Sequence, residues 1–174
     1  MDSVSISFGV MALLVFLALA FDFMNGFHDA ANAIATVVST RVLKPHTAVI
    51  LAAVCNVAAI FIFDLHVAAT VGKGAIQASI IDYHIVFGAL VAAISWNIIT
   101  WYYGIPSSSS HALIGGLIGA AVAKAGPSAL INAGVLKTVA FIVISPILGM
   151  VLGSVMMILV AWLFKDTTPR KAEN

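Results

Sequence analysis

The sequence predicts an all-α, polytopic membrane protein. Of its 174 residues 62% are hydrophobic and only 9% are charged, whereas soluble domains carry about 25% charged residues. The mean hydropathy is +1.12. A chain of this length cannot bury so much apolar surface in a core of its own, so we expect membrane lipid to surround it. The net charge of +1 leaves no basic face for nucleic acid.

Four apolar runs are long enough to cross a bilayer, which takes about 20 helical residues. They are residues 4–24, 45–63, 84–103 and 135–164. Pro45 opens the second run, where a first helical turn tolerates it. Aromatic residues of the kind found at membrane interfaces end the third run, and Pro146 is expected to break the fourth. The N-terminus lacks the basic region of a signal peptide, so we expect the first run to stay in the protein and span.

Two further apolar segments, residues 26–40 and 111–125, are too short to cross alone and are rich in small residues. Such segments are typical of the discontinuous or re-entrant helices that line transporter sites. Residues 64–82 predict an amphipathic segment or a loop. We therefore expect about four full spans and two short helices in one transmembrane domain, residues 1–174, with a polar tail at 165–174.

The first short segment carries a polar cluster inside an otherwise apolar stretch, FDFMNGFHDAANAIATVVST. On a helix, Asp29 and Asn32 share one face, and Asn25 lies one turn before Asp29. The pair Asn25 and Gly26 predicts a helix break. A half-helix would then start near Gly26, with free N–H groups that attract anions.

The oxygens of Asn25, Asp29 and Asn32 suit a Na⁺ ion, or a proton at the carboxylate. A charged residue at mid-bilayer costs at least about 2.5–3.5 kcal/mol, so Asp29 indicates a function. Asp22, near the end of the first run, is equally well explained as an interfacial residue. His28 is a possible proton relay, and a structural histidine is the alternative.

A second polar cluster lies in ISWNIITWYYGIPSSSSHALIGGLIGAA, where four serines, Ser107 to Ser110, precede His111 and a glycine-rich helix. Serines are favoured N-caps. Their hydroxyls and the free N–H groups of a helix start would form a neutral, donor-rich cradle for an oxyanion. A plain capped loop is the alternative. Three glycines of the helix predict a close helix contact: Gly115, Gly116 and Gly119.

An enzyme is not expected. Ser110 and His111 invite comparison with a serine hydrolase, but adjacent residues at a helix start point away from each other. The glycines of a nucleophile elbow are also missing. The sequence predicts no resident cofactor and no metal site. His111 is a second possible proton relay.

The two polar stretches resemble the inorganic phosphate transporter (PiT) family in its bacterial form. NGFHDAANAIAT is similar to the family signature, and WNIITWYYGIPSSSSHALIGG and SPILGMVLG are similar to further family stretches. The resemblance implies symport of inorganic phosphate across a bacterial inner membrane, driven by H⁺ or Na⁺. It implies that phosphate travels free or as a divalent-metal complex. It places Asp29 and Asn32 at a cation site with Asn25 nearby, and Ser108, Ser109 and Ser110 at the phosphate.

One departure from the family is large. Members of the family contain two inverted halves, each with such a signature, and this sequence contains one. The chain therefore resembles the N-terminal half, one repeat of an inverted-repeat transporter. We expect it to need a second half or an antiparallel copy of itself. The alternative is a membrane assembly subunit that does not transport.

Overall fold

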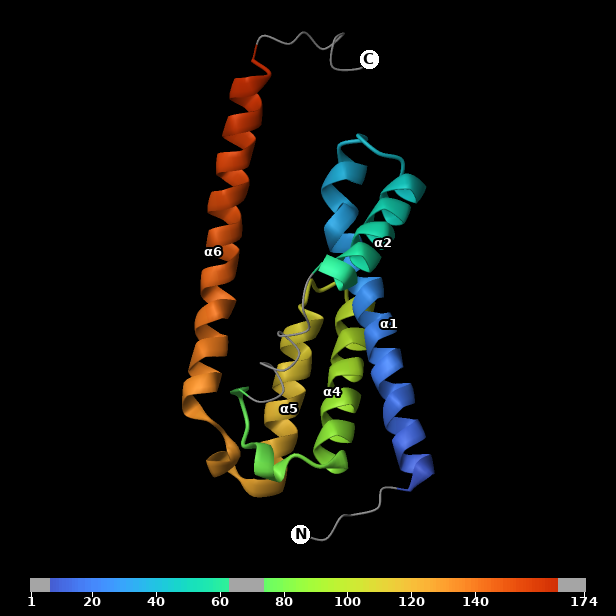
Figure 1. Ribbon diagram of the computed structural model, residues 1–174, viewed down its shortest axis with the longest axis vertical. Helices are drawn as coiled ribbons and strands as arrows, with labels where there is room; N and C mark the ends of the chain where they lie inside the picture. Colours follow the sequence, from blue (N-terminus) through green and yellow to red (C-terminus); the bar gives the residue numbers. More distant parts are fainter. Residues whose placement is uncertain (1–6, 63–73, 166–174) are drawn as a thin grey trace. The chain divides into compact units, whose positions relative to one another are not determined.

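The computed structural model describes residues 7–62 and 74–165 (Figure 1). These residues form helices almost throughout, as the sequence predicts. The elements in chain order are α1 (Phe8–Ser39), α2 (Pro45–Ile62), the 3₁₀ turn η1 (Ala78–Ile80), α4 (Tyr83–Tyr102), α5 (Ser109–Ala125), the 3₁₀ turn η2 (Pro127–Ala129) and α6 (Asn132–Leu163). The chain divides into two compact units, residues 1–132 and 133–174, each described here by itself.

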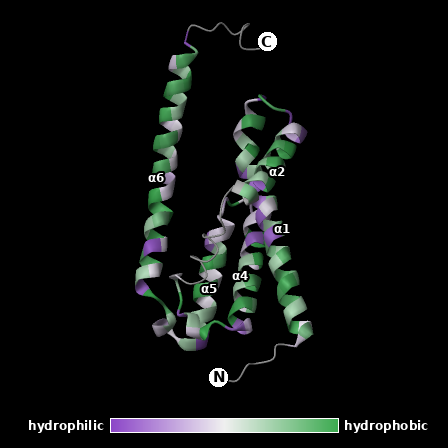
Figure 2. Cartoon of the chain, in the orientation of Figure 1, coloured by the Kyte–Doolittle hydropathy of each residue, from purple (hydrophilic) through white to green (hydrophobic). Residues whose placement is uncertain are grey.

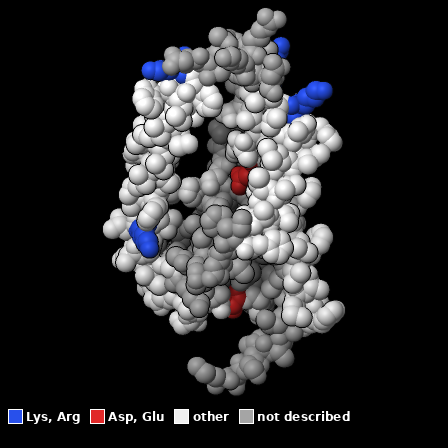
Figure 3. Space-filling model, turned by 45° about the horizontal axis from the view of Figure 1, so that its top comes forward, with Lys and Arg blue, Asp and Glu red and all other residues white. Residues whose placement is uncertain are grey.

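Three helices are long and apolar enough to cross a membrane: α1, α4 and α6. A shorter apolar stretch, Pro45–Ala59, lies within α2, which begins at Pro45 as predicted. Charged side chains are sparse on the visible surface (Figure 3). The predicted total of four spans and the inverted repeat both stay predictions. The first six residues, most of the 64–82 segment and nearly all of the polar tail lie outside the described residues.

The predicted helix break at Asn25 and Gly26 is wrong. Helix α1 runs without interruption for 32 residues, from Phe8 to Ser39. A glycine inside a helix costs only about 1 kcal/mol relative to alanine. An opened helix in hydrocarbon would instead leave backbone groups without partners, at several kcal/mol each. The helix therefore continues through Gly26, and no free N–H groups arise there.

Pro146 does not break the last helix either. Helix α6 runs from Asn132 to Leu163 with Pro146 in its interior. Proline removes one backbone hydrogen bond, and membrane helices tolerate this where local adjustments satisfy the freed carbonyl.

Helices α4 and α5 form an antiparallel hairpin, and they lie side by side (Figure 1). A Cβ atom added at Gly116 would lie 2.7 Å from the carbonyl oxygen of Ala89, so the two backbones touch there. The predicted glycine contact is therefore confirmed at Gly116. At Gly115 and Gly119 an added Cβ would meet nothing within 4 Å among the described residues, so these two glycines do not contact α4. Only one face of α5 turns toward α4, and these two glycines lie off it.

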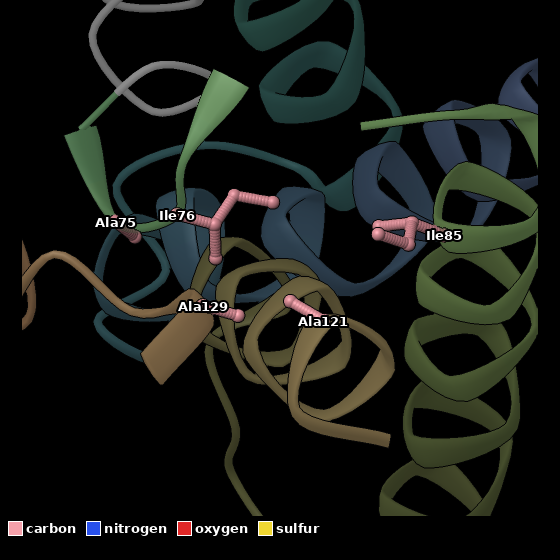
Figure 4. Close-up of a cluster of buried hydrophobic side chains, with 5 residues drawn as sticks. All are labelled: Ala75, Ile76, Ile85, Ala121 and Ala129. Carbon is pink, nitrogen blue, oxygen red and sulfur yellow. The ribbon is translucent and has the colours of Figure 1, made fainter. Parts of the chain in front are cut away.

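The base of this hairpin is closed by the segments that flank it. Ile76 and Leu130 form an antiparallel bridge. A cluster of buried side chains fills the space beside the bridge: Ala75, Ile76, Ile85, Ala121 and Ala129 (Figure 4). Burial of these apolar groups fixes where α4 starts and where α5 ends.

Asp82 adds a helix cap and an ion pair at the base. Its carboxylate caps α4 by accepting a hydrogen bond from the Ile85 N–H at 3.1 Å. It also lies 2.8 Å from the Lys124 ammonium at the end of α5. The hydrogen bonds from Lys124 and then from His84 hold the pKa of Asp82 well below its usual range. These interactions hold the start of α4 against the end of α5.

One face of α1 packs along the hairpin. Phe21 is buried against Leu90 and Ala93 of α4, and Ala112 and Leu113 of α5 pack on the same cluster. The packing places the base of the hairpin toward the start of α1 and its tip toward the middle of α1.

Candidate functional site

The two polar clusters predicted from sequence meet at the tip of the hairpin. Ser109, the first residue of α5, donates its hydroxyl to the side-chain oxygen of Asn25 on α1. Ser109 is 1% exposed. In the cartoon coloured by hydropathy, hydrophilic residues of this unit gather where α1 meets the end of α4 and the start of α5 (Figure 2). Tertiary packing thus makes one polar region out of segments 84 residues apart.

Each of the first three serines has a distinct partner. Ser108 is the N-cap of α5 and accepts a hydrogen bond from the His111 N–H, which confirms the predicted capping. Ser107 accepts a hydrogen bond from the Trp96 indole at 2.9 Å. Ser110 is exposed. The hydroxyls are therefore spread over a helix start, which also presents its first backbone N–H groups.

A groove of about 430 Å³ lies between α1 and the tip. It is lined by Phe27, His28, Ala31, Asn32, Thr100, Trp101, Gly104, Ile105, Pro106 and Ser107. Phe27 and Trp101 meet edge to face at one wall, with ring centroids 6.0 Å apart. Among these described lining residues none carries a positive charge. An anion held here would depend on hydroxyl, amide and backbone donors.

His28 is half-buried in this region. Its Nδ1 lies 3.2 Å from the Met24 carbonyl oxygen, to which it donates in the corresponding neutral tautomer. Its Nε2 is buried and has no hydrogen-bond partner within residues 7–62 and 74–165. An unsatisfied buried polar atom costs about 1–3 kcal/mol.

A second groove, of about 640 Å³, follows the α4–α5 seam. It is lined at one end by Trp96, Ser107, Ser108 and His111, and along its length by small residues that include Gly115 and Gly119. His28 and His111 therefore line different grooves. Ser107 lines both, so the serine loop separates them.

The predicted cation-site residues do not all point to one place. Asn25 contacts Ser109, and Asn32 lines the groove beside the tip. Asp29 is exposed on α1, as is Asp22. In residues 7–62 and 74–165, no three His, Cys, Asp or Glu side chains gather closely enough to hold a metal ion.

The sequence interpretation omitted three α4 residues near the tip. Trp96 bonds Ser107, Thr100 lines the groove, and Asn97 is 1% exposed. The nitrogen of the Asn97 side chain has no hydrogen-bond partner among the residues that the structure describes. The sequence signal that could have identified this site was Asn97, an amide in an apolar span, with Thr100 one turn later.

Comparisons with known proteins give a consistent result. A profile of the "Phosphate transporter family" matches residues 25–174. A probable low-affinity inorganic phosphate transporter of Rhizobium meliloti (strain 1021) is 53% identical over 165 residues, which are 95% of this chain and 49% of that protein. A Streptomyces halstedii protein of the same description is 46% identical, over 92% of this chain and 76% of its own length.

A solved structure, "The sodium-dependent phosphate transporter", has a similar fold. Its TM-score is 0.82 at 27% sequence identity, over 94% of this chain and 42% of that chain. This chain thus spans about half the length of the Rhizobium meliloti relative and less than half of the solved transporter.

Proposed function

Since the chain belongs to the phosphate transporter family, we propose that it supplies one half of a site that moves inorganic phosphate across the inner membrane of a bacterium. Transport would be secondary and coupled to H⁺ or Na⁺. The relatives are described as transporters rather than enzymes.

The observation that carries this proposal is the contact between Ser109 and Asn25. Asn25 lies 17 residues after Phe8 in the 32-residue α1, or about 26 Å along the helix axis. The hairpin tip therefore reaches α1 near its middle, which would lie near the middle of a bilayer if α1 spans it symmetrically. Transporter sites lie near the bilayer midplane, where helix ends meet their ligands.

The start of α5 supplies the groups that an oxyanion needs. Its first N–H groups carry the positive end of the helix dipole, and Ser108, Ser109 and Ser110 add hydroxyls. With no lysine or arginine among the described groove residues, binding would be weak enough for release. If phosphate travels as a divalent-metal complex, the metal enters with the substrate as cargo.

The coupling ion would use α1. Oxygens of the kind that Asn25, Asn32 and Asp29 carry suit a dehydrated Na⁺. Because these side chains do not converge on one point within this chain, the facing half would have to complete the ion site. The solved structure is named as sodium-dependent, which favours Na⁺ in this proposal. Proton coupling is the alternative, with the Asp29 carboxylate as the proton acceptor and His28 or His111 as relays.

The chain would not complete the site alone. It covers 49% of the Rhizobium meliloti relative, so we propose that a second half, or an antiparallel copy of this chain, supplies the facing side. A membrane assembly subunit without transport activity is the second candidate, favoured by the same partial coverage.

Uptake of radiolabelled phosphate into proteoliposomes tests the proposal. The chain is reconstituted alone, and also joined to the part of the Rhizobium meliloti relative that it does not match. We expect uptake by the joined protein under a Na⁺ or pH gradient, and none by the chain as a monomer. Uptake by a cross-linking-verified monomer would contradict the need for a second half. No uptake by the joined protein under either gradient would favour the assembly subunit.

A further inference from the structure

Two buried polar atoms among the described residues lack hydrogen-bond partners, and both lie near the hairpin tip. They are Nε2 of His28 on α1 and Nδ2 of Asn97 on α4. Nearly all buried polar groups in proteins are paired, so each exception requires an explanation. Asn97 is the more demanding case, because the whole residue is only 1% exposed.

The helical register places Asn97 in the same layer as Asn25 and Ser109. Phe21 of α1 packs with Ala93 of α4 and with Ala112 of α5. One turn further along α1 and α4 lie Asn25 and Asn97, and Ser109 lies about one turn before Ala112. Ser109 does bond Asn25, which confirms the register between α1 and α5. Each of the three helices therefore contributes one polar side chain to this layer.

The neighbouring Thr100 shows how a polar side chain on this helix can find its hydrogen-bond partners within α4. The Thr100 hydroxyl donates to the carbonyl oxygens of Trp96 at 2.9 Å and Asn97 at 3.2 Å. It is satisfied within α4. The Asn97 amide nitrogen makes no such bond.

The side-chain nitrogen of Asn97 is a hydrogen-bond donor, so it needs an acceptor as its partner. The same layer holds the first backbone N–H groups of α5, which are donors as well. A set of uncharged donors from two helices, buried in an apolar body, fits an oxyanion better than it fits a metal cation.

We propose that Asn97 binds the transported phosphate, with its side-chain amide donating to an oxygen of the anion. The proposal rests on the proposed transport function and adds a residue of α4 to the serines of α5. A phosphate oxygen would then be the hydrogen-bond acceptor for this nitrogen in each transport cycle.

The variant Asn97→Leu tests this assignment in the joined protein used for uptake. Leucine matches asparagine in branching and approximate size and removes the unpaired amide. Replacing an unsatisfied buried polar group by an apolar one is neutral or stabilising, whereas a lost donor to a charged ligand weakens binding. We expect an unchanged or higher thermal midpoint in detergent and a KM for phosphate raised tenfold or more. Asn56→Leu, the same change at an exposed position of α2, serves as the matched control.

Each other outcome contradicts the inference. Uptake by Asn97→Leu with the wild-type KM would show that the amide does not touch phosphate. A lowered thermal midpoint together with lost uptake would show that Asn97 has a partner within the protein, such as Nε2 of His28. The smaller variant Asn97→Ala guards against misfolding: a wild-type KM there would also overturn the assignment. If the joined wild-type protein takes up no phosphate, the proposed function fails first and the inference fails with it.

Discussion

The two ends of the α4–α5 hairpin treat their polar groups differently. At the base, the Asp82 carboxylate accepts from the Ile85 N–H and pairs with Lys124, beside a buried apolar cluster. At the tip, Ser109 bonds Asn25 across helices, while Nε2 of His28 and Nδ2 of Asn97 are buried and find no partner in the described part of the chain.

This difference suits two separate tasks: the base anchors the hairpin, and the tip, under the proposed function, binds the ligand. Satisfied polar groups and apolar packing lower the free energy of the folded state, so the base holds the hairpin in place. Unsatisfied groups raise that free energy, and proteins retain such sites where a ligand uses them. Variants at the tip should therefore change transport with little change in stability, and variants at the base should do the reverse.

The largest effect is expected beside the tip, at Asp29 on α1. We expect Asp29→Asn to abolish phosphate uptake by the joined protein, because the amide cannot carry the charge or the proton that couples transport. The side chain is exposed and the change is nearly isosteric, so the thermal midpoint should stay unchanged. Wild-type uptake by a stably inserted Asp29→Asn protein would remove Asp29 from the coupling site.

At the tip itself, Ser109→Ala should weaken phosphate affinity about tenfold or more. The change removes the hydroxyl that donates to Asn25 in this structure and that would turn to the ligand when phosphate binds. A hydrogen bond to a charged ligand is worth about 1.5–3 kcal/mol. Ser107→Ala should cost less, because Ser107 precedes the N-cap of α5 and its oxygen accepts from the Trp96 indole. The KM for phosphate measures both. Equal and small effects would mean that the serines form only a capped loop.

The middle of the hairpin should behave like its base. Gly116→Ala forces a Cβ against the Ala89 carbonyl, and we expect the free energy of unfolding to fall by about 1–3 kcal/mol. Gly119→Ala meets open space, so it should be neutral or stabilising by up to about 1 kcal/mol. Denaturation in detergent compares the two variants. Equal destabilisation would contradict the register of α4 against α5.

The smallest effect is expected at the base. Asp82→Ala should lower stability by about 1 kcal/mol through the lost helix cap and surface ion pair, with the KM for phosphate unchanged. Because the folded-state pKa of Asp82 is depressed, its contribution is full above the ordinary carboxyl pKa near 4. It is lost as the pH falls from there through the folded-state value. Unfolding midpoints of wild type and variant at pH 7, 5 and 3 check this: the difference should be constant at first and then narrow. A raised KM would mean that the base also serves the site.

The sequence alone determined the membrane class and most of the helix positions. Hydropathy located α1, α2, α4 and α6 because lipid demands long apolar helices. Pro45 and Ser108 marked helix starts through chemistry local to the backbone. The polar residues of both clusters were visible for the same reason, since charged and amide groups are conspicuous in an apolar chain.

Only the tertiary structure decided how these parts combine. Local signals predicted breaks at Gly26 and Pro146, and continuous helices prevailed because an opened backbone in lipid costs more than a glycine or a proline does. The assignment of Gly116 to the helix contact, and of Gly119 to a groove, depended on which face of α5 turns toward α4. The meeting of Ser109 with Asn25, and the burial of Asn97 beside them, arise from packing between segments far apart in the chain, which no local pattern encodes.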